Sequence, residues 1–320
     1  MRLPAPAFRL SLFALCAIAS SAIAPPRLFG LPQNALARAQ ALFAKGDYPR
    51  VIYLLSPAAL EGLRSKKAPA AEYLLAESYA RTGRAEKALA IYQVAVKLYP
   101  RDIHLLMGLA ELFREAGLNS RARPLYVRIL ERNPLDAEAH LGLARIDKNL
   151  GFLKRSLRHY SLAQDSGKPR ADIWREEAEV LLSLNAFEAA KDAARRALGL
   201  SPSDRRTLFL MGRIARASGD IPAALHDLDE AAGISRPRPE LLRARTLWLL
   251  EAGRVREAGR AARAILSSRP RDPLAHWVLA EIALRTGRLA AARANLKAAA
   301  RFAAEGSFVS RSAKAALKNI

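Results

Sequence analysis

Apolar residues recur at helical spacing along residues 69–306, and the pattern repeats with a fixed step of 34 residues. Single glycines mark the step, and an asparagine stands where one of them would fall: Gly83, Gly117, Gly151, Asn185, Gly219, Gly253 and Gly287. The segment holds seven units of 34 residues without an insertion. A fixed period of this length is typical of stacked helical units, so the pattern predicts paired helices in a solenoid.

The first unit, residues 69–102, carries small, aromatic and turn residues at unit positions 8, 11, 15, 20, 24, 27 and 32: Ala76, Tyr79, Gly83, Ala88, Tyr92, Ala95 and Pro100. This arrangement resembles the tetratricopeptide repeat, whose signature has small residues at 8, 20 and 27, large apolar residues at 4, 11 and 24, and proline at 32. Position 20 is alanine in six of the units and Ser156 in the other. The resemblance covers all seven units.

Steric requirements explain the signature. Positions 8 and 20 face each other where the two helices of a hairpin cross, and only small side chains allow close approach there. Glycine at position 15 accepts the positive φ that ends the first helix, and asparagine is the next most tolerant residue. Position 24 holds a large apolar residue in five units but Ala194 and Ala262 in the other two, so we expect looser packing around those two second helices.

The chain ends differ from the repeated units. Residues 25–68 form a short linker and a divergent first hairpin, with helices expected over 34–45 and from Arg50 to Leu55, a turn at 46–48, and Pro57 ending or kinking the second helix. Residues 307–320 predict a last helix whose apolar face, including Phe308 and Val309, covers the end of the stack. The predicted fold is all-α: a right-handed superhelical solenoid of about eight antiparallel helix-turn-helix hairpins with a C-terminal capping helix over 307–320.

Residues 1–24 have the features of a secretory signal peptide. Arg2 and Arg9 precede an apolar stretch that is too short to span a bilayer, and small residues fit cleavage after Ala19 or Ala24. Cleavage after Ala19 is chemically cleaner, because Pro25 follows Ala24. We therefore expect an exported protein, periplasmic or secreted, without a membrane span in the mature chain; an uncleaved N-terminal anchor is the alternative.

Composition narrows the function further. The one cysteine, Cys16, lies within residues 1–24, so the expected mature chain has no thiol for a disulfide, a metal site or a nucleophile. The net charge is +22 and the isoelectric point is 10.8, a field that attracts polyanions in general. Arginine used as an ordinary solvent-facing helix former is the alternative explanation for this excess.

No catalytic or metal-binding pattern stands out in the repeats. The five histidines lack the His-x-x-x-His and His-Glu-x-x-His spacings, and His140 and His276 occupy position 4, where the family places a packing residue. The glycines occur singly at turns and form no phosphate-binding loop. We therefore expect no enzyme activity, no cofactor and no metal.

The family resemblance implies where a partner would bind. In tetratricopeptide repeats the first helix of each unit lines a concave groove through positions 2, 5, 9, 12 and 13. These positions hold seven basic residues in the middle units: Arg145, Lys148, Arg175, Arg206, Arg213, Arg216 and Arg243. Aromatic residues occupy position 5 in three units: Tyr73, Phe209 and Trp277. Two interpretations stay open, a positively charged pocket for an anionic ligand and a mixed groove whose charges pair with one another.

The sequence therefore favours a non-enzymatic protein–protein interaction scaffold in the bacterial envelope. Its concave, partly basic groove would bind a peptide or partner protein, in secretion, envelope assembly or exopolysaccharide export. The alternative is direct binding of an acidic polysaccharide or another polyanion along the groove. An intracellular adaptor and a nucleic-acid binder are less favoured, given the export signal. The Lys/Asn pair that co-chaperones use at positions 5 and 9 to grip a carboxylate is absent from every unit.

Overall fold

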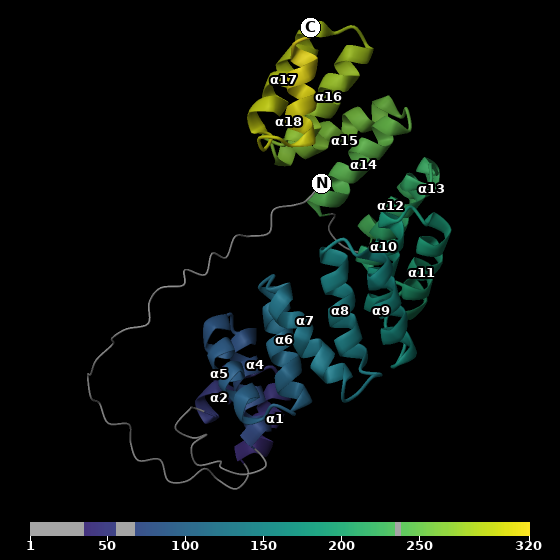
Figure 1. The fold of residues 1–320 in the computed structure, drawn as a ribbon. Helices are drawn as coiled ribbons and strands as arrows, with labels where there is room; N and C mark the ends of the chain where they lie inside the picture. Colours follow the sequence, from purple (N-terminus) through teal and green to yellow (C-terminus); the bar gives the residue numbers. More distant parts are fainter. Residues whose placement is uncertain (1–34, 56–67, 234–237) are drawn as a thin grey trace, which may run out of the picture. The chain divides into compact units, whose positions relative to one another are not determined.

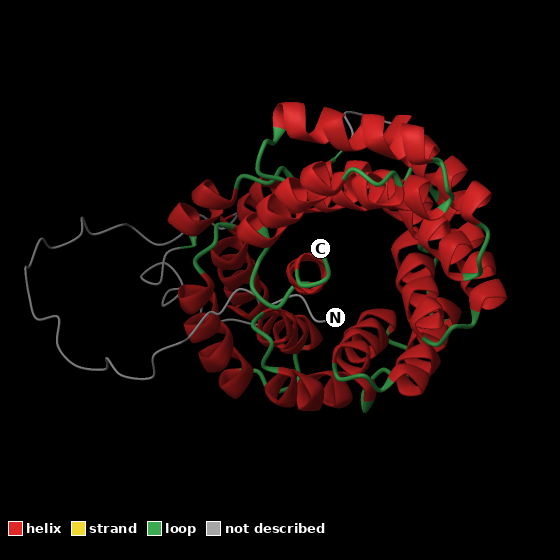
Figure 2. Cartoon of the chain, turned by 90° about the horizontal axis from the view of Figure 1, so that it is seen from above, coloured by secondary structure: helices red, strands yellow, loops and turns green. Residues whose placement is uncertain are grey.

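The computed structural model describes residues 35–55, 68–233 and 238–320, and every element within these ranges is a helix (Figures 1 and 2). Backbone contacts divide the chain into two compact units, residues 1–167 (unit 1) and residues 168–320 (unit 2). Each unit contains consecutive helical hairpins, in which a first helix packs against the second helix that follows it. The all-α prediction and the paired-helix architecture are confirmed.

Unit 1 contains four hairpins. The helices are, in pairs, α1 (Ala35–Ala44) with α2 (Tyr48–Leu54), α4 (Ala68–Arg81) with α5 (Ala85–Leu98), α6 (Ile103–Glu115) with α7 (Asn119–Leu130), and α8 (Ala137–Asn149) with α9 (Leu153–Asp165). The helix α2 begins two residues earlier than expected. Asp47 caps it by accepting a hydrogen bond from the backbone N–H of Arg50 at 3.3 Å, and Pro49 fits the first helical turn.

Unit 2 contains four more hairpins and one final helix. The pairs are α10 (Ala171–Ser183) with α11 (Phe187–Leu200), α12 (Arg205–Ala217) with α13 (Ile221–Gly233), α14 (Pro239–Glu251) with α15 (Val255–Ser268), and α16 (Pro273–Arg285) with α17 (Leu289–Phe302). The last helix, α18 (Phe308–Leu317), packs on α17 and α16. Seven of the eight hairpins follow the 34-residue frame, and the first hairpin and the terminal helix lie outside it, as the sequence predicts.

The turn inside each hairpin is confirmed at the predicted position. Gly83 has a φ of 76° and Gly117 a φ of 74°, and Asn185 takes the same left-handed conformation with a φ of 59°. Asn185 is the one non-glycine residue with a positive φ among the residues that the structure describes. A β-carbon is strained in this region of backbone space, and asparagine bears that strain better than most residues.

The close crossing of the two helices is also confirmed. A β-carbon on Gly212, at position 8 of its unit, would lie 3.0 Å from the carbonyl oxygen of Ala224, at position 20. In the unit where position 20 is Ser156, its buried hydroxyl donates a hydrogen bond to the carbonyl oxygen of Ala144, at position 8, over 2.8 Å. Position 20 therefore lies against the backbone of the partner helix, which leaves room only for small side chains.

Aspartates at position 34 precede four of the eight first helices. Asp102, Asp136 and Asp272 accept hydrogen bonds from backbone N–H groups three residues later, at 2.9 to 3.1 Å. A side chain of this kind satisfies one of the free donors at a helix start and stabilises it by about 1 kcal/mol. Position 34 is arginine before α10 and α14, where Arg170 and Arg238 provide no such bond.

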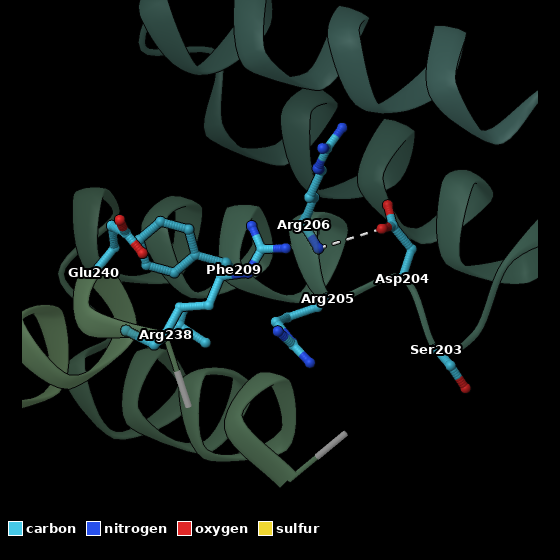
Figure 3. A pocket seen from close by; sticks show the side chains of 8 residues that line it. Ser203, Asp204, Arg205, Arg206, Phe209, Arg238 and Glu240 are labelled. Atoms are coloured by element: carbon cyan, nitrogen blue, oxygen red, sulfur yellow. Dashed lines mark hydrogen bonds between the residues drawn. The ribbon is translucent and has the colours of Figure 1, made fainter. Parts of the chain in front are cut away.

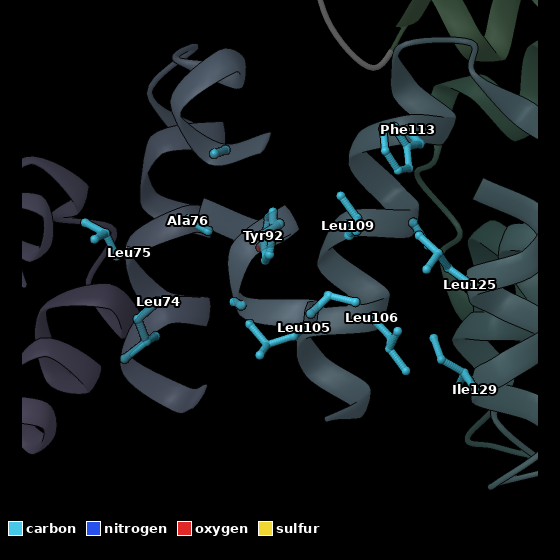
Figure 4. Packing of buried hydrophobic residues seen from close by; sticks show 14 of the residues in the cluster. Leu74, Leu75, Ala76, Tyr92, Leu105, Leu106, Leu109, Phe113, Leu125 and Ile129 are labelled. Atoms are coloured by element: carbon cyan, nitrogen blue, oxygen red, sulfur yellow. The ribbon is translucent and has the colours of Figure 1, made fainter. Parts of the chain in front are cut away.

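The core of unit 1 is one continuous apolar cluster that runs through its hairpins (Figure 4). Tyr92 and Tyr126, both at position 24, are fully buried within it. Each ring occupies the space above a glycine of the next hairpin: a β-carbon on Gly108 would lie 2.4 Å from Tyr92, and one on Gly142 would lie 2.3 Å from Tyr126. The glycines at position 6 thus make room for the tyrosines, a dependence that the repeat signature did not predict.

Unit 2 has separate apolar clusters, and the last of them confirms the terminal cap. Ala313 of α18 is fully buried against Leu296 and Ala299 of α17, with Val309 and Leu317 packed beside them. Phe308 differs from the expectation, because 46% of it is exposed. Its ring meets the ring of Trp277 edge to face, with 5.4 Å between the centroids, at the border of a groove described below.

The N-terminal signal sequence, the linker, Pro57 and the rest of residues 56–67 lie outside the described residues, so those expectations stay predictions. Among the helices that the structure does describe, none combines the length and the apolar character needed to cross a bilayer.

Candidate functional site

The groove positions of unit 1 are occupied by side chains that bind one another. Glu77 of α4 accepts hydrogen bonds from the Tyr92 hydroxyl at 3.0 Å and from Arg81 Nε at 2.7 Å. Glu111 of α6 is bound by the Tyr126 hydroxyl and, at 2.6 Å, by Arg114. Burial, and then the nearby glutamate, raises the pKa of each tyrosine, so both phenols stay protonated and act as donors.

The predicted groove residues of unit 1 are also packed. Tyr73 is half-buried, with its ring centroid 5.7 Å from that of His104 and 6.5 Å from that of Tyr92. Arg145 and Lys148 are half-buried on α8, and both have interaction partners. This part of the groove therefore fits the interpretation of a mixed surface whose charges are satisfied internally.

A buried polar cluster lies behind the groove of unit 1. Asp147 of α8 has a fully buried side chain, bound by Arg123 of α7 and by Arg155 of α9 at 2.8 Å. His159 lies 4.0 Å from the same carboxylate and shares an Nδ1–Nδ1 contact of 3.2 Å with the buried His140. His140 Nε2 donates to a carbonyl oxygen, that of Pro134, so its neutral Nδ1 is the acceptor from His159. His140 thus packs in the core as predicted, with added hydrogen bonds.

Three of the predicted groove arginines in unit 2 connect consecutive hairpins. Arg175 binds Asp204 at 3.1 Å, and Arg243 binds Asp272, whose side chain is fully buried, at 2.6 Å. Both arginines thus reach the capping aspartate of the next first helix. Arg216 forms a bidentate pair with Glu251, with both contacts at 2.7 Å. The carboxylates already neutralise these three guanidinium groups, and each pair joins one hairpin to the next.

An apolar pocket of about 350 Å³ lies between these hairpins, and we call it the Trp277 pocket. It is lined mainly by groove positions of α12, α14 and α16, together with the first residue of α18: Arg216, Leu247, Leu250, Glu251, Trp277, Arg285 and Phe308. The Arg216–Glu251 pair borders the pocket, and Arg285 is exposed beside it. The family positions thus converge in unit 2 as the resemblance implies.

Trp277, which lines this pocket, has an indole N–H without an acceptor in the described part of the chain. Its Nε1 atom is buried and has no hydrogen-bond partner among the described residues. A buried donor without an acceptor costs about 1–3 kcal/mol, and a ligand that brings an acceptor would recover part of that. Phe209, the other predicted aromatic of this unit, instead stacks on Trp248 with 6.1 Å between the centroids and 11° between the planes.

A second opening, of about 540 Å³, lies at the start of α12 and α14, and we call it the Arg205 cleft (Figure 3). Its lining contains three arginines, two acids, a serine and two apolar residues: Ser203, Asp204, Arg205, Arg206, Phe209, Arg238, Glu240 and Leu241. Arg206 and Phe209 were predicted groove residues, whereas Arg205 and Arg238 were not. Arg238 stands at position 34, where most units have a capping aspartate. This departure from the repeat is the sequence feature that could have pointed to the cleft. The remaining predicted residue, Arg213, is exposed and lines neither opening.

A cluster of one histidine and two acids lies on α13. His226, Asp227 and Glu230 each offer one ligand atom, and these atoms lie within 4.8 Å of one another. His226 and Glu230 are exposed, and all three come from one turn of a single helix. Exposed groups of this kind are common on helices, and the site lies outside both openings.

The comparisons with known proteins agree with this geometry. Family models described as tetratricopeptide repeat match residues 69–112, 103–146 and 248–307. One similar crystal structure is that of PilW, described as a widely conserved type IV pilus biogenesis factor. Its sequence is 16% identical to this chain, the TM-score is 0.63, and the match covers 67% of this chain and 100% of PilW. That of pilF from Pseudomonas aeruginosa is 16% identical with a TM-score of 0.55, covering 67% of this chain and 97% of that one.

A third similar structure is that of the Cut9–Hcn1 hetero-tetramer of APC/C, 15% identical with a TM-score of 0.59. The match covers 89% of this chain but 55% of that one, so this chain spans about half the length of that relative. At these identities the likeness concerns the fold alone. The comparison with curated proteins returns no match.

Proposed function

We propose that the groove of unit 2 binds a segment of a partner protein, because residues 69–146 and 248–307 match models of the tetratricopeptide repeat. Repeats of this family serve as protein–protein interaction scaffolds and are generally non-catalytic. The observation that supports the proposal most strongly is the Trp277 pocket, where groove positions from three hairpins and an unpartnered indole N–H converge. The partner would place one large apolar side chain there.

The chemistry of the pocket suits an anchor residue. Leu247, Leu250 and Phe308 supply apolar walls, so an aliphatic or aromatic side chain entering the pocket would lose contact with water. Anchor residues of this kind supply most of the binding energy at protein interfaces. A backbone carbonyl of the bound segment can accept the hydrogen bond from Trp277 Nε1, and this would orient the segment.

We further propose that the scaffold works outside the cytoplasm, in the bacterial envelope. Residues 1–24 supply the argument, because their charge and apolar pattern is that of a signal peptide. Envelope assembly, secretion and exopolysaccharide export are the processes in which we place it. The fold likeness to PilW is compatible with a role in assembly, by analogy at the level of the fold.

The experiment is affinity capture from envelope extracts, with the wild-type protein and with Trp277→Ala as baits. We expect one stoichiometric protein that is retained at high salt, because apolar contacts are little screened, and lost with Trp277→Ala. Leu289→Ala is the matched control, since this apolar side chain is 57% exposed on the second helix α17. Equal capture by wild type and Trp277→Ala would contradict the proposal.

A further inference from the structure

We propose that the Arg205 cleft is an acidic-peptide site, which binds a pair of Asp or Glu side chains on the segment that enters the Trp277 pocket. The proposal deepens the proposed function and rests on it. It adds a second chemical requirement for the partner: acidic residues at a fixed distance from the apolar anchor.

The lining of the cleft carries an excess of positive charge. The guanidinium groups of Arg205, Arg206 and Arg238 form no ion pair with any residue in the described ranges. Of the two acids, Asp204 is already bound by Arg175 at 3.1 Å, which leaves Glu240 as the one carboxylate on the cleft without such a partner. The cleft thus keeps two positive charges in excess, a balance that favours an anionic ligand.

Arg238 differs from Arg170, the other arginine at position 34. Arg170 forms a bidentate pair with Asp172, two residues later, at 2.7 and 3.0 Å. Arg238 has Glu240 at the same spacing, but the structure shows no pair between them. The donors of Arg238 therefore stay available at the opening of the cleft.

Arg205, which lines the cleft, also has an unsatisfied donor: its Nε atom is buried and has no hydrogen-bond partner among the described residues. A guanidinium group presents several N–H donors in one plane, which matches the two oxygens of a carboxylate. A ligand carboxylate in the cleft can therefore satisfy donors that the chain itself leaves without acceptors.

The apolar part of the lining favours a peptide over a sugar polymer. Phe209 and Leu241 supply apolar surface beside the arginines, and this suits the methylene groups of Glu and the carbons of a peptide backbone. Phe209 is the one aromatic residue among the described residues that line the cleft, and one face of its ring is already stacked on Trp248. Little aromatic surface is therefore left for a sugar ring. An acidic polysaccharide becomes the competing outcome of the test.

The distance between the two sites fixes the spacing in the partner. The residues Arg206 and Arg216 of α12 line the cleft and the pocket respectively. They are ten residues apart in one helix, which is about 15 Å along its axis. An extended peptide advances about 3.3 Å per residue, so roughly four to six residues separate the acidic pair from the apolar anchor.

The test uses designed peptides and the full-length protein. One peptide carries Trp, a five-residue Gly/Ser linker and Glu-Glu; the others replace Glu-Glu by Ser-Ser or Lys-Lys, remove the linker, or reverse the order. Binding is measured by fluorescence anisotropy at low and high salt. We expect the Glu-Glu peptide in one of the two orders to bind about tenfold or more tighter than the Ser-Ser peptide at low salt, and the advantage to shrink at high salt.

Two charge-reversal variants localise the effect. In Arg206→Glu/Arg238→Glu, we expect the Glu-Glu advantage to disappear while the Ser-Ser peptide binds as before. Arg256→Glu/Arg263→Glu is the matched control, since both arginines are exposed on α15 and outside the cleft, and it should keep the advantage. Circular dichroism and thermal melting verify that all variants are folded.

The outcomes separate this proposal from the proposed function. A Glu-Glu advantage that survives Arg206→Glu/Arg238→Glu overturns the acidic-peptide site, whereas loss of all peptide binding in Trp277→Ala supports the pocket independently. Peptide binding that depends on the cleft arginines but is unchanged in Trp277→Ala contradicts the anchor pocket instead. If an oligomer of guluronate binds more tightly than the Glu-Glu peptide and depends on the same arginines, the site is one for a polysaccharide and the peptide proposal fails.

Discussion

The two units use the same repeat frame but treat their groove positions differently. In unit 1, position 9 is Glu77, Glu111 and Arg145, and the hydroxyls of Tyr92 and Tyr126 bind the two carboxylates from the core side. In unit 2, position 24 is alanine or leucine, so no tyrosine hydroxyl reaches the groove, and position 9 is Glu179, Arg213, Leu247 and Glu281. Unit 1 satisfies its groove internally, whereas unit 2 leaves an apolar pocket and a basic cleft open.

The difference teaches that position 24 decides more than core packing. A tyrosine at position 24 fills the core, and its hydroxyl also donates a hydrogen bond to the carboxylate at position 9 of the neighbouring helix. A leucine or alanine at position 24 packs in the core but makes no hydrogen bond to the groove, so the groove side chains stay available to a partner. The groove of unit 2 is therefore the more suitable binding surface, although unit 1 follows the repeat signature at position 24 more closely.

The largest expected effect concerns the arginines that connect hairpins in unit 2. Arg243→Gln leaves the fully buried carboxylate of Asp272 without its counter-charge. The Arg243 side chain is 41% exposed, so the loss is smaller than for a fully buried pair and lies at roughly 1.5–3 kcal/mol, the range for a hydrogen bond to a charged group. We expect a markedly lower denaturation midpoint in chemical unfolding, and a partial recovery in Arg243→Gln/Asp272→Asn. Unchanged stability in the single variant would mean that this arginine is a free groove residue after all.

The next effect tests how the tyrosines are accommodated in unit 1. Gly142→Ala places a β-carbon 2.3 Å from the ring of the fully buried Tyr126, so the core must rearrange. We expect a loss of about 1–3 kcal/mol in unfolding free energy. Gly199→Ala in α11 of unit 2 is the control: a β-carbon there meets nothing within 4 Å, and better helix propensity should stabilise it by up to about 1 kcal/mol. Similar losses in both would refute this packing.

A smaller effect comes from the histidine pair of unit 1. Burial, and then His140, lowers the pKa of His159, and the nearby Arg123 and Arg155 add to this, while Asp147 opposes it. The unfolded chain therefore binds the proton more readily, and stability should fall as the pH drops below about 6.5. His159→Asn copies the His276–Asn295 contact of unit 2 and should weaken this dependence. Thermal melting between pH 5 and 8 checks both; an identical pH profile in the variant would contradict it.

The smallest expected effect concerns the alanines at position 24 of unit 2. Ala194 and Ala262 are fully buried but bring less apolar bulk than Leu228 and Leu296 at the same position. We expect amide hydrogens of α11 and α15 to exchange faster than those of α13 and α17. The observation that α11 and α15 are the best-protected helices of unit 2 would count against this.

The fold could be predicted from the sequence because its rules are local. Small residues at positions 8 and 20 and a left-handed residue at position 15 act within one hairpin, so Gly212, Ala224 and Asn185 could be interpreted without a structure. The site was predicted only in part. Trp277 and Arg206 line the two openings, but Arg175 and Arg243 are bound to the capping aspartates of the next hairpin.

The parts that were missed depend on contacts between hairpins. Gly108 and Gly142 are needed because of tyrosines sixteen residues earlier, and no single unit shows this. Arg205 and Arg238 line the cleft together from two different hairpins. Phe308 was expected to cover the stack end, yet it faces Trp277 because the terminal helix contributes to the groove. A pattern within one unit carries no information on such pairs.

The most direct test of the contrast between the two units is site-specific photo-crosslinking at position 13. Arg285 in unit 2 and Asn149 in unit 1 are both exposed at this position, and each can be replaced by a photoreactive phenylalanine in the full-length protein. The account predicts a discrete protein adduct from position 285 that disappears in Trp277→Ala, and none from position 149. Equal adducts at both positions, or an adduct at 285 that is unaffected by Trp277→Ala, would contradict it.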